Sequence, residues 1–233
     1  MLARIRGRSR SGASWMDARC RRFAQGRRDS HSTPYQTVRD RRFSIASTIP
    51  FVADLDRQLF YAINGWPDAL APVFWFFSEA TKQGWVRVAL AALFVGMLWR
   101  SPRSRVAALL AVVAVALSNE LCDVLKNLFM MPRPSVELPD AIVRTARLTS
   151  FGTASAHSAN MAAVAWVMTA RLGRWGWAWI PIALLTGVSR VYNGVHYPYQ
   201  VLLGWVVGVV CGLAVDRIAR AWEKRKAKVE AEP

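Results

Sequence analysis

The sequence predicts an all-α fold, a polytopic membrane bundle of about six transmembrane helices. Hydrophobic residues make up 53% of the 233 residues, yet the chain carries a formal net charge of +16. Apolar runs of helical length recur after residue 65, which is typical of membrane helices. Basic clusters follow every second run, as the positive-inside rule predicts for cytoplasmic loops.

Residues 1–45 are predicted to be a disordered, Arg-rich cytoplasmic tail. They hold twelve Arg, no Lys and three Asp, and they show almost no apolar periodicity. Arg-Arg-Phe at 21–23 and at 41–43 resembles part of a twin-arginine export signal, and the composition also resembles a transit peptide. Because the basic residues flank apolar runs, anionic lipid is the expected partner of this charge, and nucleic acid is not.

Residues 46–65 are predicted to form an amphipathic helix that lies on the membrane surface, since Phe51, Leu55, Leu59, Phe60 and Ile63 follow a helical spacing. Residues 66–218 form the predicted membrane domain, and 219–233 a basic cytoplasmic C-terminal tail. The predicted spans are Ala69–Thr81, Trp85–Trp99, Val106–Leu125, Ser158–Leu172, Trp175–Val188 and Val201–Val215. The first is the weakest, because it is short and holds Glu79.

The basic clusters predict the orientation of the bundle. They lie at 100–105, 171–174 and 217–228, so alternating spans place all three on one side, the cytoplasm. Both termini are cytoplasmic if Ala69–Thr81 crosses the bilayer. The same alternation places 127–156 and 191–197 on the opposite side.

Three polar stretches gather at that opposite side. In the first, Lys126 and Arg133 lie two helical turns apart, and Pro134 follows them. In the second, Ser155 and His157 open the fourth span. In the third, Arg190 and His196 flank the Asn193-Gly194 turn. Taken singly, each has a plainer interpretation: a snorkelling Lys, a headgroup-anchoring Arg, a helix-capping Ser or an interfacial His.

Taken together, these residues suit phosphoryl transfer. Lys and Arg side chains, with the free amides of a helix N-terminus, match the charge on the oxygens of a phosphoryl group. Two histidines can divide the remaining work between a nucleophile and a general acid. Cys20, Cys122 and Cys211 show neither a disulfide pattern nor metal-ligand spacing, and are interpreted as small apolar fillers.

The three stretches resemble the motifs of the type 2 phosphatidic acid phosphatase superfamily, whose helical core is shared with vanadium haloperoxidases. The first family motif, Lys, six residues, Arg-Pro, is complete at Lys126, Arg133 and Pro134. The second, Pro-Ser-Gly-His, reads Ala154-Ser155-Ala156-His157. The third, Ser-Arg, five residues, His, three residues, Asp, keeps Ser189, Arg190 and His196 but has Gln200 at the Asp position. The resemblance covers roughly residues 50–220.

The resemblance implies the role of each residue. His196 would be the nucleophile, His157 the general acid, and Lys126, Arg133, Ser155 and Arg190 the phosphate-binding residues. It implies no metal or other cofactor, a phosphorylated membrane lipid as substrate, and a bacterial inner-membrane enzyme whose active site faces the periplasm. Outside the motifs, Arg144 and Arg147 could contact a second phosphate, or could simply be solvated.

Gln200 leaves two functions open. The family Asp would orient the nucleophilic His and stabilise its positive charge; the Gln amide oxygen can accept the same hydrogen bond but carries no charge. An amide turned the other way would favour the wrong tautomer. The chain is therefore either a lipid phosphatase, whose rate Gln200 could lower, or a non-hydrolysing relative that binds phosphorylated lipid. The sequence carries no signature of the particular lipid or of an oligomeric state.

Overall fold

The computed structural model describes residues 50–146, 148 and 150–231. The predicted tail at 1–45, residues 46–49 of the predicted interfacial helix, and Arg147 lie outside the described residues. Within them the secondary structure is helical, as predicted. The α-helices are α4 (Pro50–Asn64), α5 (Ala71–Glu79), α6 (Gly84–Arg100), α7 (Pro102–Phe129), α8 (Pro134–Glu137), α9 (Ala156–Leu172), α10 (Trp179–Tyr192) and α11 (Pro198–Ala231), and short 3-10 turns are η1 (Asp68–Leu70), η2 (Ala80–Lys82) and η3 (Gly173–Ala178).

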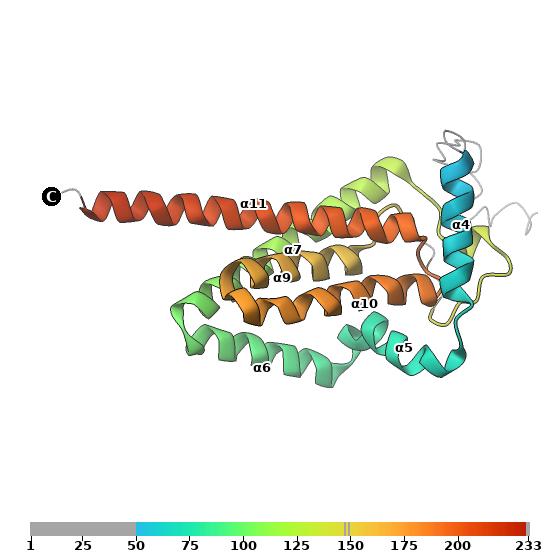
Figure 1. The fold of residues 1–233 in the computed structure, drawn as a ribbon, viewed down its shortest axis with the longest axis horizontal. Coiled ribbons are helices and arrows are strands. Elements are labelled where there is room, and N and C mark those ends of the chain that lie inside the picture. The colour runs from blue at the N-terminus through green and yellow to red at the C-terminus, as the bar shows by residue number, and fades with distance from the viewer. Residues whose placement is uncertain (1–49, 147, 149, 232–233) are drawn as a thin grey trace, which may run out of the picture. The chain divides into compact units, whose positions relative to one another are not determined.

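Helix α9 lies at the centre of the bundle and packs against α7, α10 and α11 (Figure 1). Small residues line these contacts, among them Ala107, Ala111, Ala114 and Ala163. The opposite faces of α7 and α11 expose Leu109, Val112, Leu202 and Val206, each at least half exposed. Small residues between helices and large apolar residues outside are typical of bundles surrounded by lipid. Among the described residues, two helical stretches are long and apolar enough to cross a membrane, 102–137 and 198–231.

Helix α5 does not make the separate crossing expected of Ala69–Thr81. Its nine residues span about 14 Å, about half of a hydrocarbon core. It packs on α10, whereas α6 packs on α7, and Figure 1 shows α5 and α6 following one another along the bundle. Glu79, the last residue of α5, is bound to Arg190 inside the bundle. Within the described residues, α5 with α6 therefore makes one pass between the two ends, and α7, α9, α10 and α11 make the others.

The three basic clusters meet at one end of the bundle. Arg171 at the end of α9 binds Asp216 and Glu223 of α11, and Arg220 donates to the carbonyl of Ala170. Val106, near the start of α7, lines the same groove as Trp222 of α11. The predicted grouping of these clusters is therefore present. Helix α11 continues without a break from the predicted domain into the predicted basic tail.

Helix α4 lies at the other end of the bundle, against α10 and α11. Phe51, Leu55 and Leu59 are exposed, whereas Phe60 is fully buried and packs against Tyr197. On its inner face, Asp56 accepts a hydrogen bond from the backbone N–H of Tyr199, in the first turn of α11. The described chain thus begins at the end opposite the basic clusters. The prediction that both termini are cytoplasmic depends on residues 1–49 and stays a prediction.

Candidate active site

A tight turn between α10 and α11 places His196. Gly194 has a φ of 75°, and a Cβ atom there would lie 2.5 Å from the carbonyl oxygen of Ile142. Only glycine combines this backbone conformation with this close approach. The N–H groups of Val195 and His196 both donate to the carbonyl of Arg190. The turn therefore holds His196 beside the last turns of α10, and Pro198 opens α11 as expected.

Both ring nitrogens of His196 have hydrogen-bond partners. Nδ1 lies 3.0 Å from Oε1 of Gln200, and Nε2 lies 2.7 Å from Nη1 of Arg133. An amide oxygen only accepts and a guanidinium only donates, so Nδ1 carries the proton and Nε2 carries the lone pair. Burial, with the charges of Arg133 and Arg190 beside the ring, holds the pKa of His196 well below its usual 6.5. The ring is therefore neutral, with Nε2 facing the cations.

The other contacts of Gln200 settle which way its amide points. Oε1 also accepts from the backbone N–H of Tyr197, and Nε2 donates to the carbonyl of Pro132 and to the Tyr199 hydroxyl. If the amide were turned over, its NH2 group would face the N–H of Tyr197 and its oxygen would face the carbonyl of Pro132, and neither pair can form a hydrogen bond. Gln200 thus supports the tautomer that the family Asp would support, but without its charge.

Gln200 also joins all three motifs. Its side chain contacts His196 and Pro132, and its backbone carbonyl accepts from the N–H of Ser155 at 3.0 Å. It is fully buried. Gly152 lies against it, since a Cβ atom at 152 would lie 2.8 Å from both Gln200 Oε1 and Arg133 Cγ. Gly152 is a residue that the sequence interpretation missed, because only the folded loop reveals this close approach.

Arg133 is buried and ties the first motif to the loop before α9 and to the turn that holds His196. Nε donates to the carbonyl of Ser150 at 2.7 Å, Nη1 to the carbonyl of Val195 at 3.0 Å, and Nη2 to the carbonyl of Phe151 at 3.1 Å. Pro132 and Pro134, which follow the end of α7, allow this loop to leave the helix.

Ser155 is the N-cap of α9, as its plainer interpretation predicts. Its fully buried Oγ accepts from the N–H and the hydroxyl of Ser158. Ala156 begins the helix with a negative φ, so the Ala in place of the family Gly causes no backbone strain. His157 lies in the first turn and is half-buried, and the charges of Arg190, Glu79, Lys82 and Lys126 all act on its ring.

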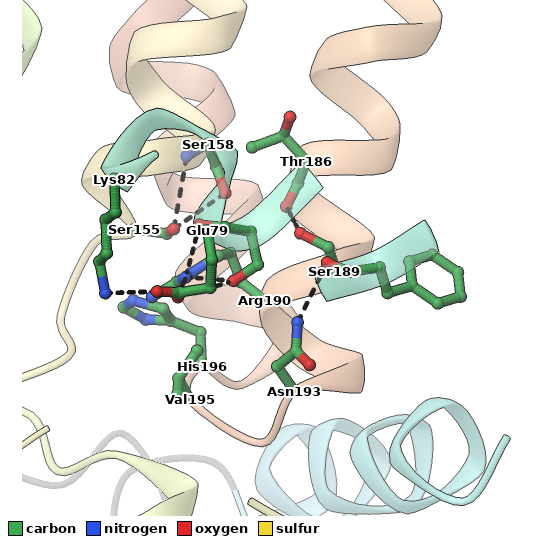
Figure 2. Close-up of polar contacts among 12 residues, drawn as sticks. Glu79, Lys82, Ser155, Ser158, Thr186, Ser189, Arg190, Asn193, Val195 and His196 are labelled. Carbon is green, nitrogen blue, oxygen red and sulfur yellow. Dashed lines mark hydrogen bonds and ion pairs between the residues drawn. The ribbon is translucent and has the colours of Figure 1, made fainter. Parts of the chain in front are cut away.

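Arg190 is 2% exposed and contacts the end of α5. Nη1 lies 3.3 Å from Glu79 Oε1 and also contacts Ser78, while Glu79 forms an ion pair with Lys82 (Figure 2). The buried Nε has no hydrogen-bond partner among the described residues. In the sequence, Glu79 stands out only as an obstacle to a membrane span. A carboxylate within an apolar segment is nevertheless the signal that predicts such a buried contact.

Two predicted cations lie apart from this network. Lys126 is held by Asp123, one helical turn earlier, at 2.7 Å, and its charge reaches His157. Arg144 binds Asp68 and the carbonyls of Asn64 and Tyr192, and its guanidinium lies over the Tyr192 ring. Arg144 therefore joins the outer loop to α4 and α10, which contradicts a solvated loop face, whereas its contact with a second phosphate stays a prediction.

Comparison with known proteins agrees with this geometry. Residues 107–224 match the family model of the PAP2 superfamily. Lipid A 4'-phosphatase from Porphyromonas gingivalis is 32% identical over 181 residues, which cover 72% of this chain and 74% of that protein. Undecaprenyl-diphosphatase BcrC from Bacillus subtilis is 35% identical over 65 residues, covering 28% of this chain and 34% of that protein.

Among solved structures, the chain is similar to the crystal structure of Aquifex aeolicus LpxE. The TM-score is 0.60 at 26% sequence identity, and the match covers 70% of this chain and 95% of that one. The helical fold, the three motifs around one buried histidine and these matches lead to a single assignment: the chain belongs to the PAP2 superfamily.

Proposed function

We propose that the chain is an integral membrane phosphatase that hydrolyses the phosphomonoester or diphosphate of a lipid. The observation that carries the proposal is the state of His196: a neutral ring with its proton on Nδ1 and its Nε2 lone pair directed at Arg133. A nucleophilic histidine needs this tautomer, and the surrounding cations are suited to the charge on a phosphoryl group. The similarity to a lipid A 4'-phosphatase and to an undecaprenyl-diphosphatase supports the substrate class.

In the proposed reaction, Nε2 of His196 bonds to phosphorus while the bond from phosphorus to the lipid oxygen breaks. His157, which the bound anionic phosphoryl group would keep protonated, gives its proton to that oxygen. Neutral His157 then takes a proton from water, the water oxygen attacks phosphorus, and the bond between phosphorus and Nε2 breaks. Phosphate leaves, and both histidines return to their starting states.

The first step requires a change at Arg133. Its Nη1 donates to the lone pair that must attack, so a phosphoryl oxygen has to take over this hydrogen bond as substrate binds. A charged oxygen is a stronger acceptor than a neutral imidazole. Arg133 would then bind the phosphoryl group and free Nε2 in the same movement. Arg190, with its unpartnered Nε, and Lys126 would supply further positive charge, so the proposed reaction uses no metal.

We place this enzyme in a bacterial inner membrane with its site facing the periplasm. The basic clusters at the opposite end of the bundle support this orientation, because such clusters mark cytoplasmic ends. The alternative is a protein that binds phosphorylated lipid without hydrolysing it. One observation favours that alternative: Gln200 offers no negative charge to the His196 ring.

The test is phosphate release by purified protein from lipid phosphates and polyprenyl diphosphates, with and without EDTA. We expect release by the wild type that persists in EDTA and is abolished in His196→Ala, while His31→Gln, a substitution in the tail, serves as the matched control. In His157→Ala, an aryl phosphate labelled with ³²P should leave an alkali-stable, acid-labile phosphoenzyme. Release that survives His196→Ala would sink the mechanism, and binding without release by the wild type would establish the alternative.

A further inference from the structure

Glu79 places a negative charge beside an arginine that is proposed to bind a negatively charged group. It is the last residue of α5, is 8% exposed, and lies outside residues 107–224 that match the family model. A carboxylate at this position would by charge alone weaken phosphate binding. Its presence therefore needs a physical explanation.

The contacts of Arg190 explain why a carboxylate lies there, because all of these contacts involve a single nitrogen of the guanidinium. Nη1 donates to Glu79 Oε1 at 3.3 Å and to the hydroxyl and carbonyl oxygens of Ser78. Nε is buried without a partner, and Nη2 forms no hydrogen bond within the part of the chain that the structure describes. The Nε–H and Nη2–H groups point in parallel from one edge of the planar guanidinium, and such an edge binds phosphate through two hydrogen bonds.

Lys82 offsets the cost of the carboxylate. It pairs with Glu79 across one turn at the end of α5, and its side chain is 56% exposed. Lys82, Glu79 and Arg190 together keep one net positive charge. Figure 2 shows these three side chains directed toward one another. Glu79 thus holds Arg190 without making the pocket negative.

We propose that Glu79 is a positioning residue of the phosphate site. With Ser78, it holds Nη1 of Arg190 so that the free Nε–Nη2 edge faces the phosphoryl group. The assignment rests on the proposed function, in which Arg190 binds phosphate. It adds to the site a residue of α5, a helix that lies before the matched family region.

The test measures the affinity for inorganic phosphate, which needs no turnover, together with kcat/KM on the lipid substrate. Glu79→Ala should weaken phosphate binding roughly 10- to 100-fold, the range for losing a charge-assisted hydrogen bond that orients a binding group. Glu79→Gln, which keeps the size and an acceptor oxygen, should recover most of this loss. Glu223→Ala is the matched control, because it breaks an ion pair with Arg171 at the opposite end of the bundle.

A double-mutant cycle with Arg190→Lys tests whether Glu79 acts through Arg190. Lysine has no bidentate edge, so Glu79→Ala should add little loss in that background. Tighter phosphate binding by Glu79→Ala, which charge alone predicts, would overturn the inference, as would an unchanged affinity. If thermal denaturation shows that Glu79→Ala fails to fold, Ser78→Ala carries the test: it removes another acceptor of Nη1 and should also weaken phosphate binding. A wild type that neither hydrolyses lipid phosphates nor binds phosphate would instead overturn the proposed function.

Discussion

His196 donates one hydrogen bond through Nδ1 and accepts one at Nε2, and the two agree on one tautomer. Gln200 can only accept at Nδ1 and Arg133 can only donate at Nε2, so a reversal of the ring proton would break both contacts. The lowered pKa of His196 follows from burial first and from the neighbouring arginines second. At the residue scale, a neutral amide is therefore sufficient to orient the ring of His196, the proposed nucleophile, and what this amide lacks is charge.

The first prediction concerns this protonation state. At pH 6, ¹⁵N NMR of histidine-labelled protein should show His196 neutral and protonated on Nδ1, because its pKa lies well below 6.5. The unfolded chain takes up a proton near pH 6.5, so the contribution of His196 to stability is present above that pH and declines as pH falls. His196→Gln provides the assignment by loss of the signal. A protonated ring at pH 6, or a proton on Nε2, would contradict this prediction.

The second prediction concerns the missing charge. Gln200→Glu keeps the length of the side chain and supplies a carboxylate, so kcat should rise. In a serine protease the related change of Asp to Asn lowers kcat on the order of 10,000-fold. The substitution also removes the donor to the carbonyl of Pro132, and this should lower stability by about 1–3 kcal/mol.

The measurements are steady-state kinetics and denaturation in detergent micelles. Gln200→Met, of similar volume, is the control that removes the acceptor altogether, and it should lower kcat. An unchanged kcat in Gln200→Glu would show that charge at this position does not limit the reaction.

At the element scale, the contact between α9 and α11 positions the second motif against the third. A Cβ atom at Gly204 would lie 2.5 Å from the carbonyl oxygen of Ser155, and one at Gly208 would lie 2.1 Å from that of Ala159. Glycine is needed at both positions so that the helices can approach closely enough for Gln200 to reach the Ser155 N–H.

The third prediction follows from this approach. Gly208→Ala should destabilise the protein by about 1–3 kcal/mol, because backbone atoms of α9 must move to admit a methyl group. Gly204→Ala should in addition lower activity, since it displaces Ser155. Gly96→Ala in α6 is the matched control, with no atom within 4 Å of the new Cβ. Denaturation midpoints check the loss of stability, and kcat/KM checks the loss of activity. Equal losses of stability in Gly96→Ala and Gly208→Ala would contradict the packing argument.

At the scale of the whole molecule, the basic clusters and the candidate active site lie at opposite ends of the bundle. The basic residues of α9 and α11 meet at one end, and His196, Arg133 and Arg190 lie at the other. Helices α9 and α10 have 17 and 14 residues, fewer than the roughly 20 of a full span. A site sunk below the headgroups agrees with these lengths.

The fourth prediction concerns orientation. In cells expressing a Cys20→Ser background, Pro139→Cys should react with a membrane-impermeant maleimide from outside, whereas Lys226→Cys should react only after permeabilisation. Both positions are exposed and lie at opposite ends, and the native Cys122 and Cys211 are buried. Labelling of Lys226→Cys in intact cells would reverse the proposed orientation.

The sequence by itself determined the helical class, the order of the three motifs, the turn at Gly194 and the start of α11 at Pro198. These depend on local signals: apolar runs, glycine at a positive φ, and proline at a helix start.

Only the tertiary structure decided the rest. The orientation of the Gln200 amide depends on Pro132, 68 residues away, and the contact of Arg190 with Glu79 joins residues 111 apart. The geometry of the site thus depends on where a buried side chain finds its partner, and neighbouring residues in the sequence do not carry that information.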